Sequence, residues 1–387
     1  MTHRRNFLKS ITLLGAAVAL PTHHLLAEGI TPPKPVGDGL FTISYMQELH
    51  RTPKPPRTIT IPDVGEYKVL KGDFHMHTLF SDGHVMPRDR VAEAVENGLD
   101  VISITDHIEY HPYFTGGKLK LAEDNDDHNR SYNLAQADAE KNNLILVRGT
   151  EITKSEWHFN AIFIQDVNTI AAEVTDWQKM IAVAVEQGGF VHWNHPSWID
   201  GTPDTPPFGL KRGEPMRFHT EIEEVCARGH LHGIEVFNGV SYYPIVLDWC
   251  NERDLAPIAN SDIHPSEWNV YGQQNLRRPM TLVLAKDRSH DSVREAFFAK
   301  RTVGWAADMI FGRPEWVEKL FRSCVEIKKE INGLSLRNTS DIPCVIEVDG
   351  RSYPLATLGA TTNLPGSPKL TVSNWFVGTN KPLEIAE

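Results

Sequence analysis

The chain has 387 residues, of which 41% are hydrophobic and 23% are charged, as is typical of folded globular proteins. This length allows one large catalytic domain with a smaller companion and excludes a single small module. The net charge of −11 argues against a basic surface that holds polymeric nucleic acid. The chain contains 18 His and 50 Asp and Glu but only 4 Cys, so metal ligation through nitrogen and oxygen is favoured over a thiolate zinc module.

Residues 1–27 contain the three parts of an export signal. Arg4 and Arg5 open a basic segment, the apolar run Ile11–Leu20 follows, and Ala27 provides a small residue near a cleavage point. This run is shorter than the about twenty residues that a membrane-spanning helix needs. The Arg-Arg-x-Phe-Leu-Lys string resembles the twin-arginine signal. We therefore expect an exported, periplasmic protein, and the absence of Cys from this segment argues against a lipid anchor.

A Pro-rich lead-in covers residues 28–65, and an alternation of short apolar runs and helical stretches occupies residues 66–310. The predicted strands are Lys68–His77, Val101–Asp106, Leu144–Glu151, His158–Ile164, Gly189–His195, Gly233–Asn238 and Ala256–Asp262. The predicted helices are Arg88–Asn97, Asn129–Asn142, Asp176–Gln187, His219–Ala227 and Pro244–Glu252. Seven such units in roughly 200 residues predict a parallel sheet closed into an α/β barrel.

The pattern changes in residues 311–387, where short alternating strands with turn residues predict a small β-sandwich after one helix. The predicted elements are the helix Pro314–Phe321 and the strands Val325–Lys328, Ser335–Asn338, Val345–Asp349 and Leu370–Ser373. Cys324 and Cys344 fall in two of the strand-like segments, and export would permit them to form a disulfide. We expect free, buried thiols instead, because none of the cysteines lies in a paired motif.

Ligand-type residues recur at the boundaries of the predicted strands. His75 and His77 alternate with Phe74 and Met76, so both imidazoles point to one side of a strand, about 6.6 Å apart along the backbone. The other boundaries carry Ser81-Asp82-Gly83, Thr105-Asp106-His107, Gly149-Thr150-Glu151, His158, Asn194-His195-Pro196 and Asp262-Ile263-His264. Since parallel barrels carry their chemistry at the carboxyl ends of the strands, these side chains are expected to gather in one site.

The order of these motifs resembles the polymerase and histidinol phosphatase (PHP) family, over roughly residues 66–310. The resemblance implies a distorted seven-stranded (β/α)7 TIM-like barrel that holds two or three divalent metal ions and hydrolyses phosphate esters. His75, His77 and Asp262 would hold a first ion, and Glu151 would bridge it to a second. The remaining implied ligands are His158 and His195 for the second ion, and Asp82, His107 and His264 for a third.

Nitrogen and oxygen ligands suit zinc, manganese and iron alike. A hydroxide shared by the two ions that Glu151 joins would attack phosphorus in line. No Ser or Cys nucleophile appears in a recognisable elbow motif.

The sequence allows more than one role for several other residues. His192 competes with His195 for the second ion, and the strand-end position favours His195. Asp106 can support a ligating His or make an ordinary hydrogen bond, and Asn238 can contact substrate or cap a turn. Trp157, Trp193 and Trp198 can line a leaving-group pocket or, more commonly for such residues, pack in the core.

The long loop Ser197–Phe218 contains three cations that can reach a phosphate group. They are Lys211, Arg212 and Arg217. Alternatively, the loop is only solvated and its cations contact no substrate; the sequence favours neither interpretation.

The sequence thus predicts an exported metal-dependent phosphoesterase that acts on small phosphodiesters or monoesters, with no signal for its oligomeric state. One alternative is an amidohydrolase, which also begins with His-x-His but typically adds a bridging Lys. Glu151 stands at that bridging position, which favours phosphate chemistry. The other alternative is a non-catalytic protein that binds a metal or another ligand.

Overall fold

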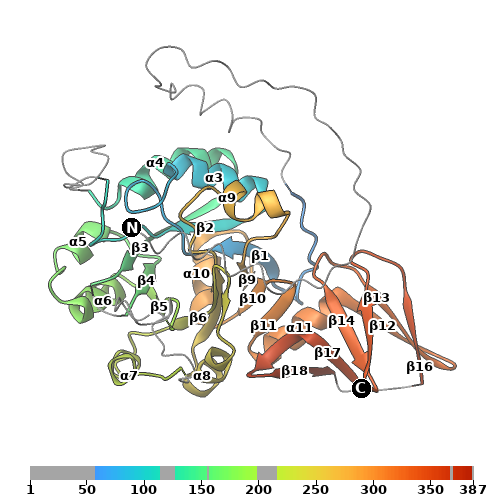
Figure 1. Cartoon of the computed structure of the whole chain (residues 1–387). Helices are drawn as coiled ribbons and strands as arrows, with labels where there is room; N and C mark the ends of the chain where they lie inside the picture. The colour runs from blue at the N-terminus through green and yellow to red at the C-terminus, as the bar shows by residue number, and fades with distance from the viewer. Residues whose placement is uncertain (1–56, 114–126, 155–156, 198–215, 367–368, 386–387) are drawn as a thin grey trace, which may run out of the picture. The chain divides into compact units, whose positions relative to one another are not determined.

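A computed structural model describes residues 57–113, 127–154, 157–197, 216–366 and 369–385 (Figure 1). The expected export signal and most of the Pro-rich lead-in lie outside these residues, as do Lys211 and Arg212. All described residues belong to one compact unit that begins at Lys54.

Each of the seven predicted strands is present. They are β1 (Lys68–Asp73), β2 (Val101–Ile104), β3 (Ile145–Ile152), β4 (Phe159–Ile162), β5 (Phe190–Trp193), β6 (Gly233–Asn238) and β8 (Ala256–Asn260). Most of these strands are buried along their whole length, which is why they read as short continuous apolar runs in the sequence.

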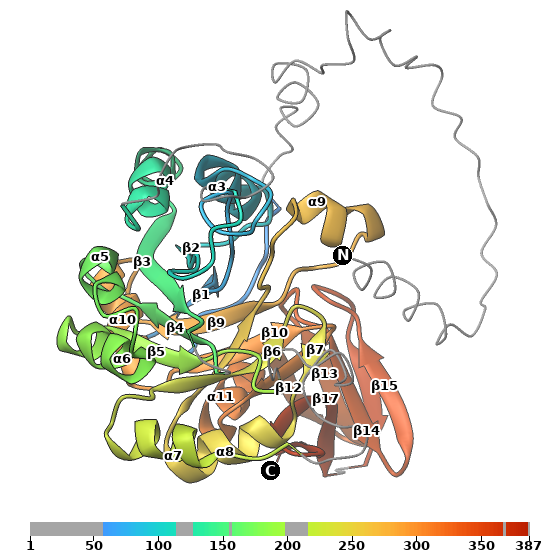
Figure 2. The same ribbon diagram turned by 60° about the vertical axis from the view of Figure 1, so that its left-hand side comes forward.

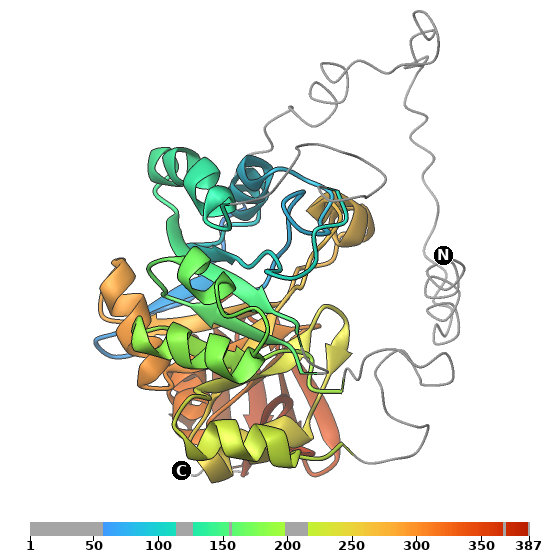
Figure 3. The same cartoon turned by 90° about the vertical axis from the view of Figure 1, so that its left-hand side faces the viewer.

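The helices predicted between the strands are also present. In Figure 3, α6 (Trp177–Glu186) faces the viewer together with α5 (Val167–Ala171), a short helix that was not predicted, and Figure 2 shows both on the outer side of β4 and β5. Asp176 begins α6 because its carboxylate accepts hydrogen bonds from the backbone N–H groups of Gln178 and Lys179. The helices of this region are α3 (Pro87–Glu96), α4 (Arg130–Lys141), α5 (Val167–Ala171), α6 (Trp177–Glu186), α7 (Thr220–Ala227), α8 (Ile245–Arg253), α9 (Glu267–Val270) and α10 (His290–Phe298).

The strands form a mixed sheet in place of a wholly parallel one. Parallel pairs join β1 to β2, β2 to β3, β5 to β6 and β6 to β8. Strand β4 runs antiparallel to both β3 and β5. The chain between Ile152 and Phe159 is shorter than the roughly dozen residues that a parallel crossover needs, so β4 must return antiparallel to β3. A regular (β/α)7 arrangement is therefore not what the structure shows.

Isolated backbone bridges bring the ends of distant strands together. Met76 bridges Ile263 in parallel, because the N–H of Asp262 donates to the carbonyl of His75 and the N–H of His77 donates to that of Ile263. The two hydrogen bonds have N···O distances of 2.9 and 3.0 Å. The chain after β1 and the chain after β8, both of which carry predicted ligands, are thus adjacent.

On its other side β1 pairs antiparallel with β9 (Met280–Ala285), which leads through β10 (Thr302–Ala306) to β11 (Met309–Gly312). These three strands were not predicted. Strand β11 pairs with β17 (Leu370–Gly378), so the C-terminal strands continue the same 15-stranded sheet. The remaining members of this sheet are β7 (Ser241–Tyr242), β14 (Cys344–Val348), β15 (Arg351–Leu355) and β18 (Lys381–Ile385).

A separate three-stranded sheet follows α11 (Pro314–Cys324). It contains β12 (Val325–Glu330), β13 (Gly333–Asn338) and β16 (Thr362–Pro365). The C-terminal region is therefore β-rich, and its arrangement as a small β-sandwich stays a prediction. Strand β11 crosses residue 310. The division of the chain into two domains at this position stays a prediction.

The four cysteines are free thiols, three of them buried, in agreement with the sequence-based expectation. Within the described parts of the chain, no helix combines the length and the apolar character that crossing a membrane requires.

Candidate metal centre

The structure brings all nine predicted ligands together in four overlapping groups. Within each group the candidate ligand atoms lie within 4.8 Å of one another. The groups are His75–His77–Glu151, His75–His195–Asp262, Glu151–His158–His195 and His77–Asp82–His107–His264. Residues from six separate strand ends thus form one continuous cluster.

Four atoms form the centre of this cluster. The Nε2 atoms of His75 and His77 each lie 3.2 Å from Oε2 of Glu151. The same two nitrogens lie 3.2 and 3.1 Å from Oδ1 of Asp262. Two imidazoles and two carboxylates therefore alternate around one small space, with the side chains of His75 and His77 wholly buried.

Glu151 presents its second oxygen to two further imidazoles. Oε1 lies 3.3 Å from Nδ1 of His158 and 3.5 Å from Nε2 of His195. A single buried carboxylate at the end of β3 therefore contacts both of these groups of nitrogen donors, as a bridging ligand must.

Asp82 organises the third group of donors. Its Oδ1 lies 3.1 Å from Nε2 of His264, 3.4 Å from Nε2 of His107 and 3.7 Å from Nδ1 of His77. The turn that carries Asp82 passes very close to the end of β1, because a Cβ on Gly83 would lie 2.4 Å from the carbonyl carbon of His77. Glycine at this position lets the turn approach closely enough to place the carboxylate.

The backbone is strained at two of the donors. His195 has φ +27° and Asp262 has φ +49°, values that side chains other than glycine rarely adopt. Both residues follow the end of a buried strand, β5 and β8 respectively. Such strain persists only where the surroundings hold it in place, and here it turns two donors into the cluster.

The spacing of the donors fits divalent cations. Ligand atoms about 2.1 Å from a shared ion in a tetrahedral arrangement lie roughly 3.4 Å apart, close to the separations around Glu151, Asp262 and Asp82. Within the described chain, several of these buried atoms also form no hydrogen bond. They are His77 Nε2, Asp82 Oδ1, His107 Nδ1 and Asp262 Oδ1. Buried polar atoms without partners are costly, and cations bound in these donor groups would provide partners for them.

The carboxylates of the cluster are held in their ionised form. Burial alone would raise the pKa of Glu151, but the imidazoles of His107 and His75 beside it hold that pKa well below its ordinary value. Burial is likewise opposed at Asp82 and Asp262, where neighbouring imidazoles lower both pKa values. Three carboxylates are therefore ready to bind a cation at neutral pH.

Without a cation, protons on His75, His77 and His264 balance part of this negative charge, because the pKa of each of these rings is raised. Burial would lower the pKa of His75, yet Asp262, Glu151 and Glu235 together raise it well above the ordinary value. A cation that binds at Nε2 must displace such a proton, so metal uptake by this cluster is expected to release protons.

A hydrogen-bond network around the partly buried Asp106 supports the donors. Asp106 accepts hydrogen bonds from the N–H and hydroxyl of Thr78, and from the hydroxyls of Ser81 and Ser131. Oγ of Ser81 lies 3.2 Å from Nδ1 of His77, so Asp106 acts on His77 through Ser81. The sequence suggested that Asp106 could support a ligating His. The structure shows such a contact, but the supported residue is His77 and not the adjacent His107.

The buried Arg90 holds the backbone of the same region. Its guanidinium donates to the carbonyls of His77, Ile263 and His264, and pairs with Glu93. Arg90 lies on α3 in a position that the sequence pattern marks only as helical. It ties the chain after β1 to the chain after β8.

The other residues considered from the sequence lie around the cluster. His192 belongs to none of the four donor groups, and its Nε2 lies 3.4 Å from Nδ2 of Asn260. Burial lowers the pKa of His192 to about 3, so this side chain is neutral. The amide of Asn238 donates to Glu235, and Arg217 is exposed just before α7. Their contacts with a phosphate stay predictions, while Lys211, Arg212 and Trp198 lie outside the described residues.

Trp157 and Trp193 are both buried and contact each other edge to face, with ring centroids 6.0 Å apart. Trp193 also stacks on Trp249. Both residues belong to a hydrophobic core cluster, which agrees with the interpretation that these tryptophans pack in the core.

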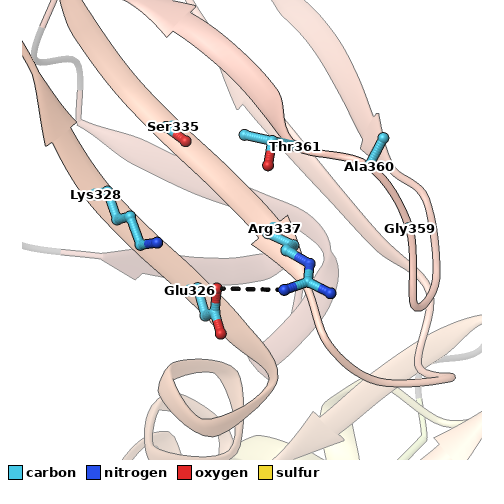
Figure 4. A pocket seen from close by; sticks show the side chains of 7 residues that line it. All are labelled: Glu326, Lys328, Ser335, Arg337, Gly359, Ala360 and Thr361. Carbon is cyan, nitrogen blue, oxygen red and sulfur yellow. Dashed lines mark ion pairs between the residues drawn. The ribbon is translucent and has the colours of Figure 1, made fainter.

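A separate pocket of about 260 Å³ lies on the three-stranded sheet and contains none of the nine donors (Figure 4). It is lined by Glu326, Lys328, Ser335, Arg337, Gly359, Ala360 and Thr361. Glu326 and Arg337 form an ion pair at 4.0 Å in which both side chains are about half exposed. The buried groups that can bind a cation are concentrated at the donor cluster and not at this pocket.

The fold and the cluster together define an α/β protein with a buried His and carboxylate centre suited to divalent cations. The model of the PHP domain family matches residues 73–191. A two-domain protein from Bacteroides vulgatus, which contains a predicted PHP-like metal-dependent phosphoesterase, is 34% identical, with a TM-score of 0.75. The match covers 85% of this chain and 98% of that one. The chain therefore belongs to the PHP family of metal-dependent phosphoesterases.

Two more distant solved structures also match. A candidate metal-dependent phosphoesterase from Bifidobacterium adolescentis is 18% identical, with a TM-score of 0.37 over 50% of this chain and 88% of that one. An amidohydrolase from Chromobacterium violaceum is 14% identical, with a TM-score of 0.36 over 51% and 89% of the two chains. Neither likeness is close enough to distinguish between activities. A comparison with curated proteins gives no match.

Proposed function

We propose that this protein hydrolyses small phosphate esters at a centre of two or three divalent metal ions. The observation that carries the proposal is the ring of His75, His77, Glu151 and Asp262, whose facing ligand atoms are separated by 3.1–3.2 Å. His158 and His195 extend this ring on one side, and the Asp82 group extends it on the other.

Bound divalent cations would supply Lewis-acid chemistry, which activates water and neutralises the charge of a phosphate group. The chain holds the donors in place: Glu151 joins two donor groups through its two oxygens, and the surrounding β-structure buries it almost completely. Asp262 and His264 have side-chain exposures of 19% and 26%, the largest among the nine donors, so a substrate would approach the cluster from their side.

The bridge between Met76 and Ile263 supports a barrel that closes between the ends of β1 and β8. In such a barrel the nine donors would lie at one end, as the sequence predicts. Closure there would explain why residues as far apart in the chain as Asp82 and His264 meet at 3.1 Å.

The substrate class is proposed from charge. With a net charge of −11, the protein is poorly suited to hold a polyanion over a wide surface. A small diester or monoester needs only the local positive charge that bound cations provide. The export signal expected in residues 1–27 supports a periplasmic location for this activity.

The test is hydrolysis of p-nitrophenyl phosphate and bis-p-nitrophenyl phosphate by the full-length protein. The protein is first stripped with a chelator and then reloaded separately with zinc, manganese or iron. We expect turnover of at least one substrate that depends on the added metal and is lost in Asp262→Asn. Asp291→Asn, which changes a fully exposed carboxylate on α10, should match the wild type. The absence of metal-dependent turnover of both esters would refute the proposal.

A further inference from the structure

Glu235 is a buried carboxylate in the middle of β6, surrounded by apolar neighbours in the sequence Gly-Ile-Glu-Val-Phe-Asn. Its side chain is 0% exposed and forms no ion pair with Lys or Arg among the described residues. Burying an ionised carboxylate is costly unless hydrogen bonds or charges compensate. Such a residue in a core strand therefore indicates a specific task.

Four hydrogen bonds compensate for this burial, two at each oxygen. Oε1 accepts from Nδ1 of His75 at 2.8 Å and from the side-chain amide of Asn260 at 2.9 Å. Oε2 accepts from the backbone N–H of His195 at 2.7 Å and from the side-chain amide of Asn238 at 2.8 Å. An ionised carboxylate offers about four acceptor positions, and all of them are used here.

These contacts determine which nitrogen of His75 is available. Because Glu235 only accepts, the proton of a neutral His75 ring must lie on Nδ1, which leaves the lone pair on Nε2. That nitrogen faces Oε2 of Glu151 and Oδ1 of Asp262, each at 3.2 Å. The ring is therefore held in the tautomer and orientation that a metal ligand requires.

Glu235 also acts on a second donor through the backbone. The N–H of His195 points to Oε2, and His195 is the residue with φ +27° at the end of β5. The hydrogen bond compensates for part of the strain at this position and fixes the backbone from which the imidazole extends. One carboxylate thus contacts a donor from each of two metal groups.

We propose that Glu235 is a positioning residue, which orients His75 through Nδ1 and His195 through its backbone so that both rings present Nε2 to the metal centre. The proposal rests on the metal centre of the proposed function and adds a residue to its machinery. Glu235 itself belongs to none of the four donor groups.

Glutamine has the right size but the wrong polarity to replace Glu235. If its oxygen faces His75, its NH₂ group meets the N–H of His195; if its NH₂ group faces His75, the proton of that ring must move to Nε2. Either arrangement disturbs one donor, whereas a merely space-filling role would tolerate the exchange. Glu235→Gln is therefore the decisive variant.

Two measurements test the proposal on the full-length protein. The first follows the imidazole nitrogens of metal-free, ¹⁵N-histidine-labelled protein by nuclear magnetic resonance, at a pH high enough for the ring of His75 to be neutral, where it distinguishes a proton on Nδ1 from one on Nε2. The second follows zinc affinity by competition with a chromogenic chelator. Asn338→Asp serves as the control, because it makes a change of equal size at a wholly buried side chain on β13, remote from the donors.

We expect His75 of the wild type to carry its proton on Nδ1, and Glu235→Gln to bind zinc about 10–100-fold more weakly. Asn338→Asp should retain wild-type zinc affinity even if its melting temperature falls. Unchanged zinc affinity in Glu235→Gln would overturn the proposal, as would a wild-type His75 that is protonated on Nε2 alone.

The position of the proton on His75 is measured in the wild type, so this test does not depend on whether a variant folds. If the wild type binds no metal at all, the proposed function fails, and the tautomer of His75 still decides the role of Glu235.

Discussion

Oε2 of Glu151 lies 3.2 Å from Nε2 of His77, and this contact joins the end of β3 to the chain that follows β1. Neither residue is near the other in the sequence, and both are buried. The other oxygen of Glu151 faces the imidazoles of His158 and His195, so this side chain joins donors from several strand ends.

The first prediction concerns this bridging carboxylate. Glu151→Gln replaces one of the two acceptor oxygens with an amide nitrogen, which cannot bind a cation. Because loss of a residue that merely supports a ligand costs about 10–100-fold in metal affinity or activity, we expect at least about 100-fold here. Phosphate-ester turnover and zinc affinity both measure the effect. Glu347→Gln on β14 is the control, and equal behaviour of the two variants would contradict a bridging role.

The second prediction concerns the third group of donors. Asp82→Asn removes the charged oxygen that faces His107 and His264, and Gly83→Ala should displace the same side chain through the clash of its Cβ with the end of β1. Both variants should bind about one metal ion fewer per chain than the wild type while the Glu151 groups retain theirs. Elemental analysis of the reloaded proteins measures this. Full metal content in both variants would exclude Asp82 as a ligand.

The third prediction separates the two serines that bind Asp106. Ser81→Ala removes the oxygen that lies against Nδ1 of His77, whereas Ser131→Ala removes a hydroxyl that contacts Asp106 but not His77. Each loss should lower the free energy of unfolding by only about 1 kcal/mol. Zinc affinity should fall about tenfold in Ser81→Ala and stay unchanged in Ser131→Ala. Equal zinc affinities would show that Asp106 supports the fold alone.

Much of the site was accessible from the sequence because its donors stand at strand ends in short motifs such as His75-x-His77 and Asp262-x-His264. The supporting residues were not, since Glu235 and Arg90 lie inside elements whose hydrophobic pattern hides them. Their roles depend on contacts with residues far away in the chain, which a local pattern does not contain.

The fold shows the same division. The strands were recognised where apolar runs end in ligand-type residues, whereas β9–β11 carry no such marker and were missed. Strand β4 is antiparallel to β3 because the connection between them is short. An alternation of predicted strands and helices does not show in which direction each strand runs. The pairing of β11 with β17 is a contact between distant segments that joins the C-terminal strands to the main sheet.

The fourth prediction concerns the stability of the buried pair Arg278–Asp73. Both side chains are 0% exposed, and Asp73 also accepts from the hydroxyl of Ser261. Arg278→Met leaves the carboxylate buried without its partner, so the free energy of unfolding should fall by about 3–5 kcal/mol. Arg322→Ala removes an exposed pair with Glu318 and should cost less than about 1 kcal/mol. Urea unfolding measures both, and similar losses would contradict this account.

The fifth prediction concerns pH. Burial lowers the pKa of His232 to about 4 from an ordinary 6.5, and its Nδ1 accepts a hydrogen bond from the backbone N–H of Val191. Between these two values the unfolded chain binds a proton that the folded chain does not, so the free energy of unfolding falls as the pH falls from 6.5 to 4. His232→Asn keeps an acceptor and removes the titration.

The variant should therefore show a flatter dependence of unfolding free energy on pH in this window. His290→Asn, at a half-exposed ring, should follow the wild type. A pH dependence that is identical in His232→Asn and the wild type would show that His232 does not titrate as described.

The most direct test of the metal centre is anomalous X-ray scattering from crystals soaked with zinc and phosphate, recorded on both sides of the zinc edge. Two or three peaks are expected: one among His75, His77, Glu151 and Asp262, one near His158 and His195, and a third beside Asp82. Phosphate density should lie against them. A map without a peak near Glu151 would contradict the central claim, whatever activity the protein showed.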